Sequence, residues 1–169
     1  KDYAGALASF RQADQYPENH QIGRDHSYVK NPQIYFCQAM ALEASGNKKE
    51  ASKVFVKVAA MPVNSGVYQY YVAMSLEKTG KKPAALELLQ RMKMEGEKLA
   101  MGQSDVDFFS KFGEDVLERI VKADGNFMLG LANLGLGEHV EAMRYFSEAA
   151  VLNPTHAWAR VYKNLVQNH

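Results

Sequence analysis

Apolar residues recur every three or four positions along most of the chain, which is the spacing of one buried face of an α-helix. Short polar stretches with glycine separate these segments, and no sustained apolar–polar alternation predicts a strand. The pattern predicts about nine helices, over roughly 2–15, 32–45, 47–60, 66–79, 82–95, 105–121, 124–136, 138–152 and 155–167. The predicted fold class is therefore all-α.

A repeat with a period of 34 residues underlies this pattern. Three pairs of residues share the spacing: Gly46 and Gly80, Ala51 and Ala85, and Phe55 and Leu89. The copy nearest the C-terminus contains Leu129, Gly130, Gly137, Ala142, Phe146, Ala149 and Pro154. We expect Gly130 and Ala142 to lie where two helices cross closely, and Gly137 to end a helix in the left-handed conformation. Phe146 is expected to fill the space between neighbouring hairpins.

The repeat divides the whole chain. A half repeat spans 1–16, a long loop 17–31, full repeats 32–62, 66–96 and 123–154, an inserted helix 104–122, and a capping helix 155–169. Compared with the regular period, the loop is 11 residues too long and the segment before the last repeat is 23 residues too long. Trp158 is expected to pack on the last hairpin as part of the capping helix.

These residues and their spacing resemble the tetratricopeptide repeat (TPR) family, whose period is 34 residues. The resemblance implies a right-handed superhelical solenoid of antiparallel helix hairpins that presents a concave groove to a protein or peptide. Two further segments, 16–24 and 106–109, resemble the C-terminal TPR region of large bacterial multidomain proteins whose preceding region looks sugar-active. Because the chain begins at Lys1 within a repeat, we interpret it as part of a longer polypeptide.

The TPR resemblance places particular side chains on the concave face. They are Phe36, Met40, Tyr70, Met74, Glu77, Phe127 and Leu131. Methionine and aromatic residues suit adaptable apolar recognition, so we expect a peptide, a helix or a neighbouring domain as the partner. TPR domains that grip the C-terminal tails of chaperones use Lys and Asn at these positions, so such tails are disfavoured. The alternative is that the chain covers these residues itself, through the long loop or the inserted helix.

The long loop is a second candidate contact surface, because long loops in compact folds are often functional. Its Arg24, Asp25 and His26 are predicted to form a polar patch for a partner or a neighbouring domain. The alternative is that Ile22 and Tyr28 hold the loop against the first hairpin.

Charge and candidate chemistry exclude several classes of protein. Lys and Arg total 20 and Asp and Glu total 19, so the net charge of +1 argues against a nucleic-acid or membrane-surface binder. The five histidines include no metal-binding pair at helical spacing, and a single cysteine, Cys37, excludes an intrachain disulfide. Glycines 130, 135 and 137 lack the Gly-Lys-Ser/Thr ending of a phosphate loop.

We therefore predict no catalytic residue, no metal and no cofactor. The leading hypothesis is a protein-interaction scaffold that is soluble and favours the cytoplasm. The alternatives are a structural or oligomerisation segment of a larger bacterial enzyme, and a carbohydrate-accessory segment acting through Tyr70, Tyr71 and Trp158.

Overall fold

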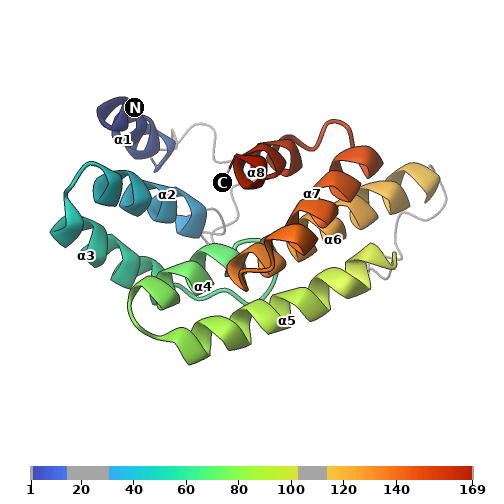
Figure 1. Ribbon diagram of the computed structural model, residues 1–169, viewed down its shortest axis with the longest axis horizontal. Coiled ribbons are helices and arrows are strands. Elements are labelled where there is room, and N and C mark those ends of the chain that lie inside the picture. The colour runs from blue at the N-terminus through green and yellow to red at the C-terminus, as the bar shows by residue number, and fades with distance from the viewer. Residues whose placement is uncertain (1, 15–30, 103–113, 169) are drawn as a thin grey trace, which may run out of the picture. The chain divides into compact units, whose positions relative to one another are not determined.

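The computed structural model describes residues 2–14, 31–102 and 114–168 (Figure 1). All regular secondary structure in these ranges is helical. The helices are α1 (Tyr3–Asp14), α2 (Asn31–Ala44), α3 (Lys48–Ala59), α4 (Gln69–Lys78), α5 (Lys82–Ala100), α6 (Glu114–Gly135), α7 (His139–Leu152) and α8 (Ala157–Gln167). The all-α class is therefore confirmed, with eight helices in the described ranges where about nine are expected for the chain.

Most predicted helix boundaries agree with the structure. The predicted helices that correspond to α1, α2, α3, α4, α7 and α8 begin and end within three residues of the observed positions. Helix α5 runs to Ala100, five residues beyond its predicted end at 95. The apolar period and the turn glycines are local signals, so they locate these helices without tertiary information.

One predicted boundary is wrong. The sequence predicts separate helices over 105–121 and 124–136, whereas α6 is continuous through this junction. Gly125 lies within α6 and packs closely against α5: a Cβ atom there would lie 2.4 Å from the backbone nitrogen of Ala100. The inserted helix 104–122 therefore continues directly into the first helix of repeat 123–154, and residues 103–113 lie outside the described ranges.

The chain divides into two compact units. Unit 1 comprises Lys1–Asn64 and Tyr71–Ala85, and unit 2 comprises Ser65–Tyr70 and Leu86–His169. In unit 1, α2 packs against α1 and α3, around a core that includes Ala39, Ala51 and Phe55. In unit 2, α7 packs against both α6 and α8. Each unit thus contains helix hairpins of its own.

Three helix-to-helix turns have the same local structure. Each contains a glycine with positive φ: Gly46 at 88°, Gly80 at 82° and Gly137 at 81°. In each turn, the glycine N–H donates to the carbonyl three residues earlier and the next N–H donates to the carbonyl five residues earlier. This is the Schellman ending of a helix, in which glycine adopts the left-handed conformation at least cost. The predicted role of Gly137 is confirmed.

The helix after each turn buries the same three positions. The triplets are Ala51, Phe55 and Val58; Ala85, Leu89 and Met92; and Ala142, Phe146 and Ala149, and none of these residues is more than 4% exposed. The first two triplets are separated by 34 residues at every position. The period in the sequence therefore corresponds to a period in turn geometry and in burial.

Close helix crossing in unit 2 depends on glycine. A Cβ atom at Gly130 would lie 2.4 Å from Cε1 of Phe146, which confirms that α6 and α7 cross closely at this position. On the other side, a Cβ atom at Gly96 of α5 would lie 3.0 Å from Cγ of Leu129 in α6. Helix α6 is thus held between α5 and α7 at distances that side chains would prevent.

We predict unequal effects of alanine at two glycines of α6. Gly125→Ala forces a methyl group onto the α5 backbone and should destabilise the protein by about 3 kcal/mol, because backbone cannot rotate away. Gly135→Ala is the matched control, since its Cβ atom meets only the side-chain end of Leu89, at 2.7 Å. Its cost should stay below about 1 kcal/mol because alanine favours the helix. Urea unfolding followed by circular dichroism measures both, and equal losses would contradict the role given to Gly125.

Candidate functional site

The seven predicted groove residues fall in different units. Phe36, Met40, Met74 and Glu77 belong to unit 1, and Tyr70, Phe127 and Leu131 belong to unit 2. The contacts within each unit therefore decide what each set can do.

In unit 1 the candidate residues are partly accessible. Phe36 is half-buried, with its ring centroid 5.8 Å from that of Phe55 and 5.7 Å from that of Tyr71. Met40 is 40% exposed. Glu77 is exposed and Met74 is half-buried. Phe36 thus supports the unit 1 core, whereas Met40 and Glu77 remain available for contacts.

In unit 2 the candidate residues are core. Tyr70 is 7% exposed, Phe127 is 5% exposed and Leu131 is fully buried. Tyr162 of α8 places its ring centroid 6.1 Å from Tyr70, 5.8 Å from Phe127 and 5.5 Å from Phe146. We call these four residues the Tyr162 cluster.

The prediction of an exposed groove at Tyr70, Phe127 and Leu131 is therefore wrong. The physical reason is that Tyr162 of the capping helix packs against the first two of these side chains. Tyr71 is also buried, at 2% exposure, so neither Tyr70 nor Tyr71 presents a ring on which a sugar could stack. Of the three aromatic residues in the carbohydrate hypothesis, only Trp158 is exposed.

The other predicted contact surface is not described. Arg24, Asp25 and His26 lie outside the described residues, as do most residues of the 17–31 loop. The same holds for 103–113 in the inserted segment.

His156 holds the start of α8 against α6. Its Nδ1 accepts a hydrogen bond from the Ala159 N–H at 3.0 Å, which caps the helix. Its Nε2 lies 3.4 Å from Oδ1 of Asp124, and its ring centroid is 4.6 Å from that of Phe127. The imidazole is therefore a structural link between two helices.

Polar side chains of unit 2 also bind structural partners. Glu95 accepts hydrogen bonds from the Gly66 N–H at 3.0 Å and from Nε2 of Gln69 at 2.7 Å. Oε1 of Gln69 is the one buried side-chain oxygen or nitrogen without a hydrogen bond among the described residues. Glu95 thus binds the segment from Gly66 to Gln69, which leads into α4.

A second polar group joins α5 to the turn before α7. Lys93 donates to Oδ1 of Asn133 at 3.0 Å and to Oε2 of Glu138 at 3.2 Å. Asn133 is fully buried, and its Nδ2 donates to the Leu129 carbonyl at 2.7 Å. This ammonium group is therefore paired with its neighbours and does not point into an open site.

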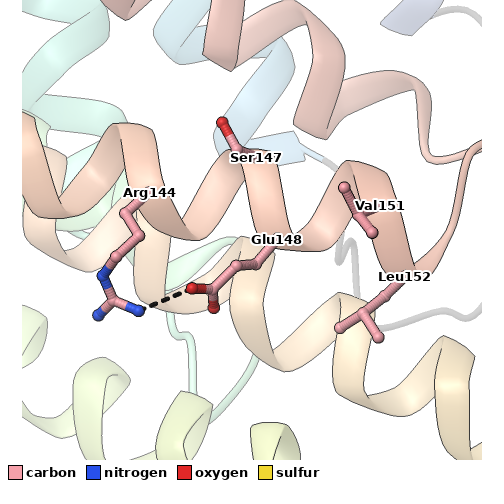
Figure 2. A pocket seen from close by; sticks show the side chains of 5 residues that line it. All are labelled: Arg144, Ser147, Glu148, Val151 and Leu152. Carbon is pink, nitrogen blue, oxygen red and sulfur yellow. Dashed lines mark hydrogen bonds and ion pairs between the residues drawn. The ribbon is translucent and has the colours of Figure 1, made fainter.

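An open hollow on α7 offers no convergent chemistry. It measures about 480 Å³ and is lined by Arg144, Ser147, Glu148, Val151 and Leu152. Figure 2 shows Arg144 and Glu148 directed toward each other across one helical turn, while Ser147 points away from them. Arg144 bonds both Glu141 and Glu148 at 2.8 Å, and these bonds raise the pKa of its guanidinium group. The arginine is therefore occupied within its own helix.

The remaining candidate groups do not assemble either. Burial raises the pKa of the Cys37 thiol, which disfavours the nucleophilic thiolate. In the part of the chain that the structure describes, no three His, Cys, Asp or Glu residues come together as a possible metal site. Within the same residues, no helix combines the length and the apolar character needed to cross a bilayer.

Helix α8 carries an exposed apolar surface that was not predicted from the sequence. Trp158 contacts Tyr162 with a centroid distance of 6.5 Å, but 49% of it remains exposed. Val161 is 44% exposed and Leu165 is 50% exposed. We call these three residues the α8 stripe. Their i, i+3, i+7 spacing is visible in the sequence, but the inward rotation of Tyr162 decides that this side faces solvent.

Comparisons with known protein families and solved structures found no match to this chain.

Tyr162 is predicted to contribute far more to stability than its neighbour on the outer face. Tyr162→Ala empties the centre of the Tyr162 cluster and should cost about 3 kcal/mol, the low end of the range for aromatic residues, because Tyr162 is half-buried. Leu165→Ala, on the exposed side of the same helix, should cost less than about 1 kcal/mol. Thermal and urea unfolding measure both variants, and a similar loss for the two would mean that Tyr162 is not core.

A separate prediction concerns the cap of α8. His156→Ala removes the acceptor for the Ala159 N–H and should destabilise the protein by about 1 kcal/mol or more. His156→Asn replaces the Nδ1 acceptor with a side-chain oxygen and should recover about half of the loss or more. Urea midpoints at constant slope provide the measurement. An asparagine variant no better than alanine would show that the ring contact with Phe127, and not the cap, is what matters.

Proposed function

We propose that this chain is a non-catalytic protein-interaction scaffold built from TPR-like hairpins in a right-handed superhelical solenoid. The observation that carries the proposal is the repeated hairpin: three Schellman turns at Gly46, Gly80 and Gly137, each followed by an equivalent buried triplet. Each hairpin needs a neighbour to cover its apolar side, so such units stack and create extended surfaces.

The chemistry of the described side chains supports a binding role. Arg144, Lys93 and Glu95 are engaged in structural ion pairs or hydrogen bonds. The hollow on α7 directs Ser147 away from the Arg144–Glu148 ion pair, so it does not place a hydroxyl beside a base. We therefore assign recognition to exposed apolar side chains, with a protein, a peptide or a neighbouring domain as the partner.

Retention of a defined polypeptide tests the proposal. The immobilised chain should retain one or a few polypeptides from an extract of the cells that encode it, and excess free chain should displace them with a single midpoint. Light scattering on the same preparation should show a monomer. An albumin column is the control for non-specific capture.

Two other outcomes of these experiments would favour the alternative functions, a structural segment or a carbohydrate-accessory segment. Self-association without any retained polypeptide would favour a structural or oligomerisation segment. Saturable binding of an oligosaccharide panel, with no protein retained, would favour the carbohydrate-accessory hypothesis.

A further inference from the structure

Helix α8 is capped by a side chain that can change its charge. Nδ1 of His156 accepts a hydrogen bond from the Ala159 N–H at 3.0 Å. A ring nitrogen accepts a hydrogen bond only when it carries no proton, so the imidazole in this cap is neutral and has its proton on Nε2. The side chains that most often cap helices, those of Ser, Thr, Asp and Asn, keep an acceptor oxygen throughout the neutral range. An imidazole does not.

The neighbours of the imidazole on α6 attract its charged form. Nε2 lies 3.4 Å from Oδ1 of Asp124, and the ring centroid is 4.6 Å from that of Phe127, which Tyr162 of α8 also contacts. A carboxylate and an aromatic ring both favour a nearby cation. The His156 ring is therefore held by α6 in either protonation state, whereas its bond to the Ala159 N–H exists only in the neutral state.

Other charged groups near this end of α8 do not oppose the change. Arg160 is exposed, and its backbone N–H donates to the His156 carbonyl at 3.4 Å. On α7, Arg144 is paired with Glu141 and Glu148. The first turn of a helix carries the positive end of the helix dipole, so a positive charge at the cap is unfavourable for α8 itself.

The turn that carries His156 is fixed independently of the imidazole. The His156 N–H donates to the Asn153 carbonyl at 2.9 Å. Oδ1 of Asn153 accepts from the N–H and the hydroxyl of Thr155, at 3.1 and 2.7 Å. None of these bonds uses the ring. A change of charge on His156 therefore acts on the first turn of α8, which begins at Ala157.

We propose that His156 is a pH-sensitive cap, which holds the first turn of α8 when neutral and releases it when protonated. One proton is taken up from water at Nδ1, and the hydrogen bond from the Ala159 N–H is lost. The capped state excludes this proton and the released state binds it, so acid favours release. Imidazole is the side chain whose charge ordinarily changes between about pH 5 and 8, which sets the range of the transition.

The released turn contains Trp158, the first residue of the α8 stripe. Tyr162, one turn further along, keeps the rest of the helix packed on Phe127 and Phe146. Acid therefore changes how rigidly the exposed indole is presented without unfolding unit 2. This regulatory property goes beyond the scaffold function and does not depend on it.

Amide hydrogen exchange of the whole chain, followed by NMR at about pH 5.5 and about pH 7.5, tests the proposal. After correction for the intrinsic pH dependence of exchange, protection of the Ala159 amide should fall about fivefold or more at the lower pH, because one cap is lost. The amide of Phe146, in the core of the same unit, should keep its protection. Unchanged protection at Ala159, or an equal fall at Phe146, overturns the proposal.

Matched variants assign the response to one histidine. His156→Asn supplies an oxygen that is not protonated in this range, so protection of the Ala159 amide should agree within about twofold at the two pH values. His139→Asn is the control, because His139 is an exposed histidine at the start of α7, and this variant should respond as the unmodified chain does. A response that persists in His156→Asn, or that His139→Asn removes, overturns the assignment.

The protonation state of the ring is measured directly. Nitrogen chemical shifts of the His156 imidazole at about pH 7.5 should show Nε2 protonated and Nδ1 unprotonated. A proton on Nδ1 at that pH overturns the proposal. Asp124→Asn removes the carboxylate that attracts the charged ring, so protection at Ala159 should be lost at a lower pH than in the unmodified chain. These measurements use the chain alone, so their failure leaves the scaffold function untouched.

Discussion

The packing of unit 2 depends on the absence of side chains at two positions of α6. Gly125 brings α6 against the backbone of α5, and Gly130 brings it against the ring of Phe146 in α7. A single added carbon at either position would lie 2.4 Å from an atom of the neighbouring helix. Interiors at crystal-like density cannot absorb such a contact without shifting a helix. The α5, α6 and α7 arrangement is therefore fixed by glycine, and it places the surface of α6 on which α8 rests.

Helices α6 and α7 each contribute an aromatic side chain that α8 shields from solvent. The rings of Phe127 and Phe146 contact each other, and Tyr162 of α8 packs against both, with all three centroid distances below 6 Å. The cap at His156 fixes where α8 begins. Tyr162 then turns inward, and Trp158, four residues earlier, contacts it with a centroid distance of 6.5 Å. Burial of one side of α8 and exposure of the other are thus two results of one rotation of the helix.

Local signals explain which features of the fold were predictable. The helix periods and the glycine turns at Gly46, Gly80 and Gly137 depend on neighbouring residues, and these predictions agree with the structure. The close approach of α5 to α6 at Gly125 is a tertiary contact, which the sequence of α6 does not record. Burial of Tyr70 depends on Tyr162, more than ninety positions away. Helical spacing locates a candidate face, but only tertiary contacts decide whether that face is covered.

The same distinction bears on the site of recognition. When each helix is considered alone, the row of aromatic and methionine residues predicts a groove. In unit 2, however, its aromatic residues Tyr70 and Phe127 are buried, so they stabilise the fold and cannot contact a ligand. Buried side chains cannot contact a partner, so in unit 2 apolar recognition is left to exposed side chains such as Trp158, Val161 and Leu165 of α8.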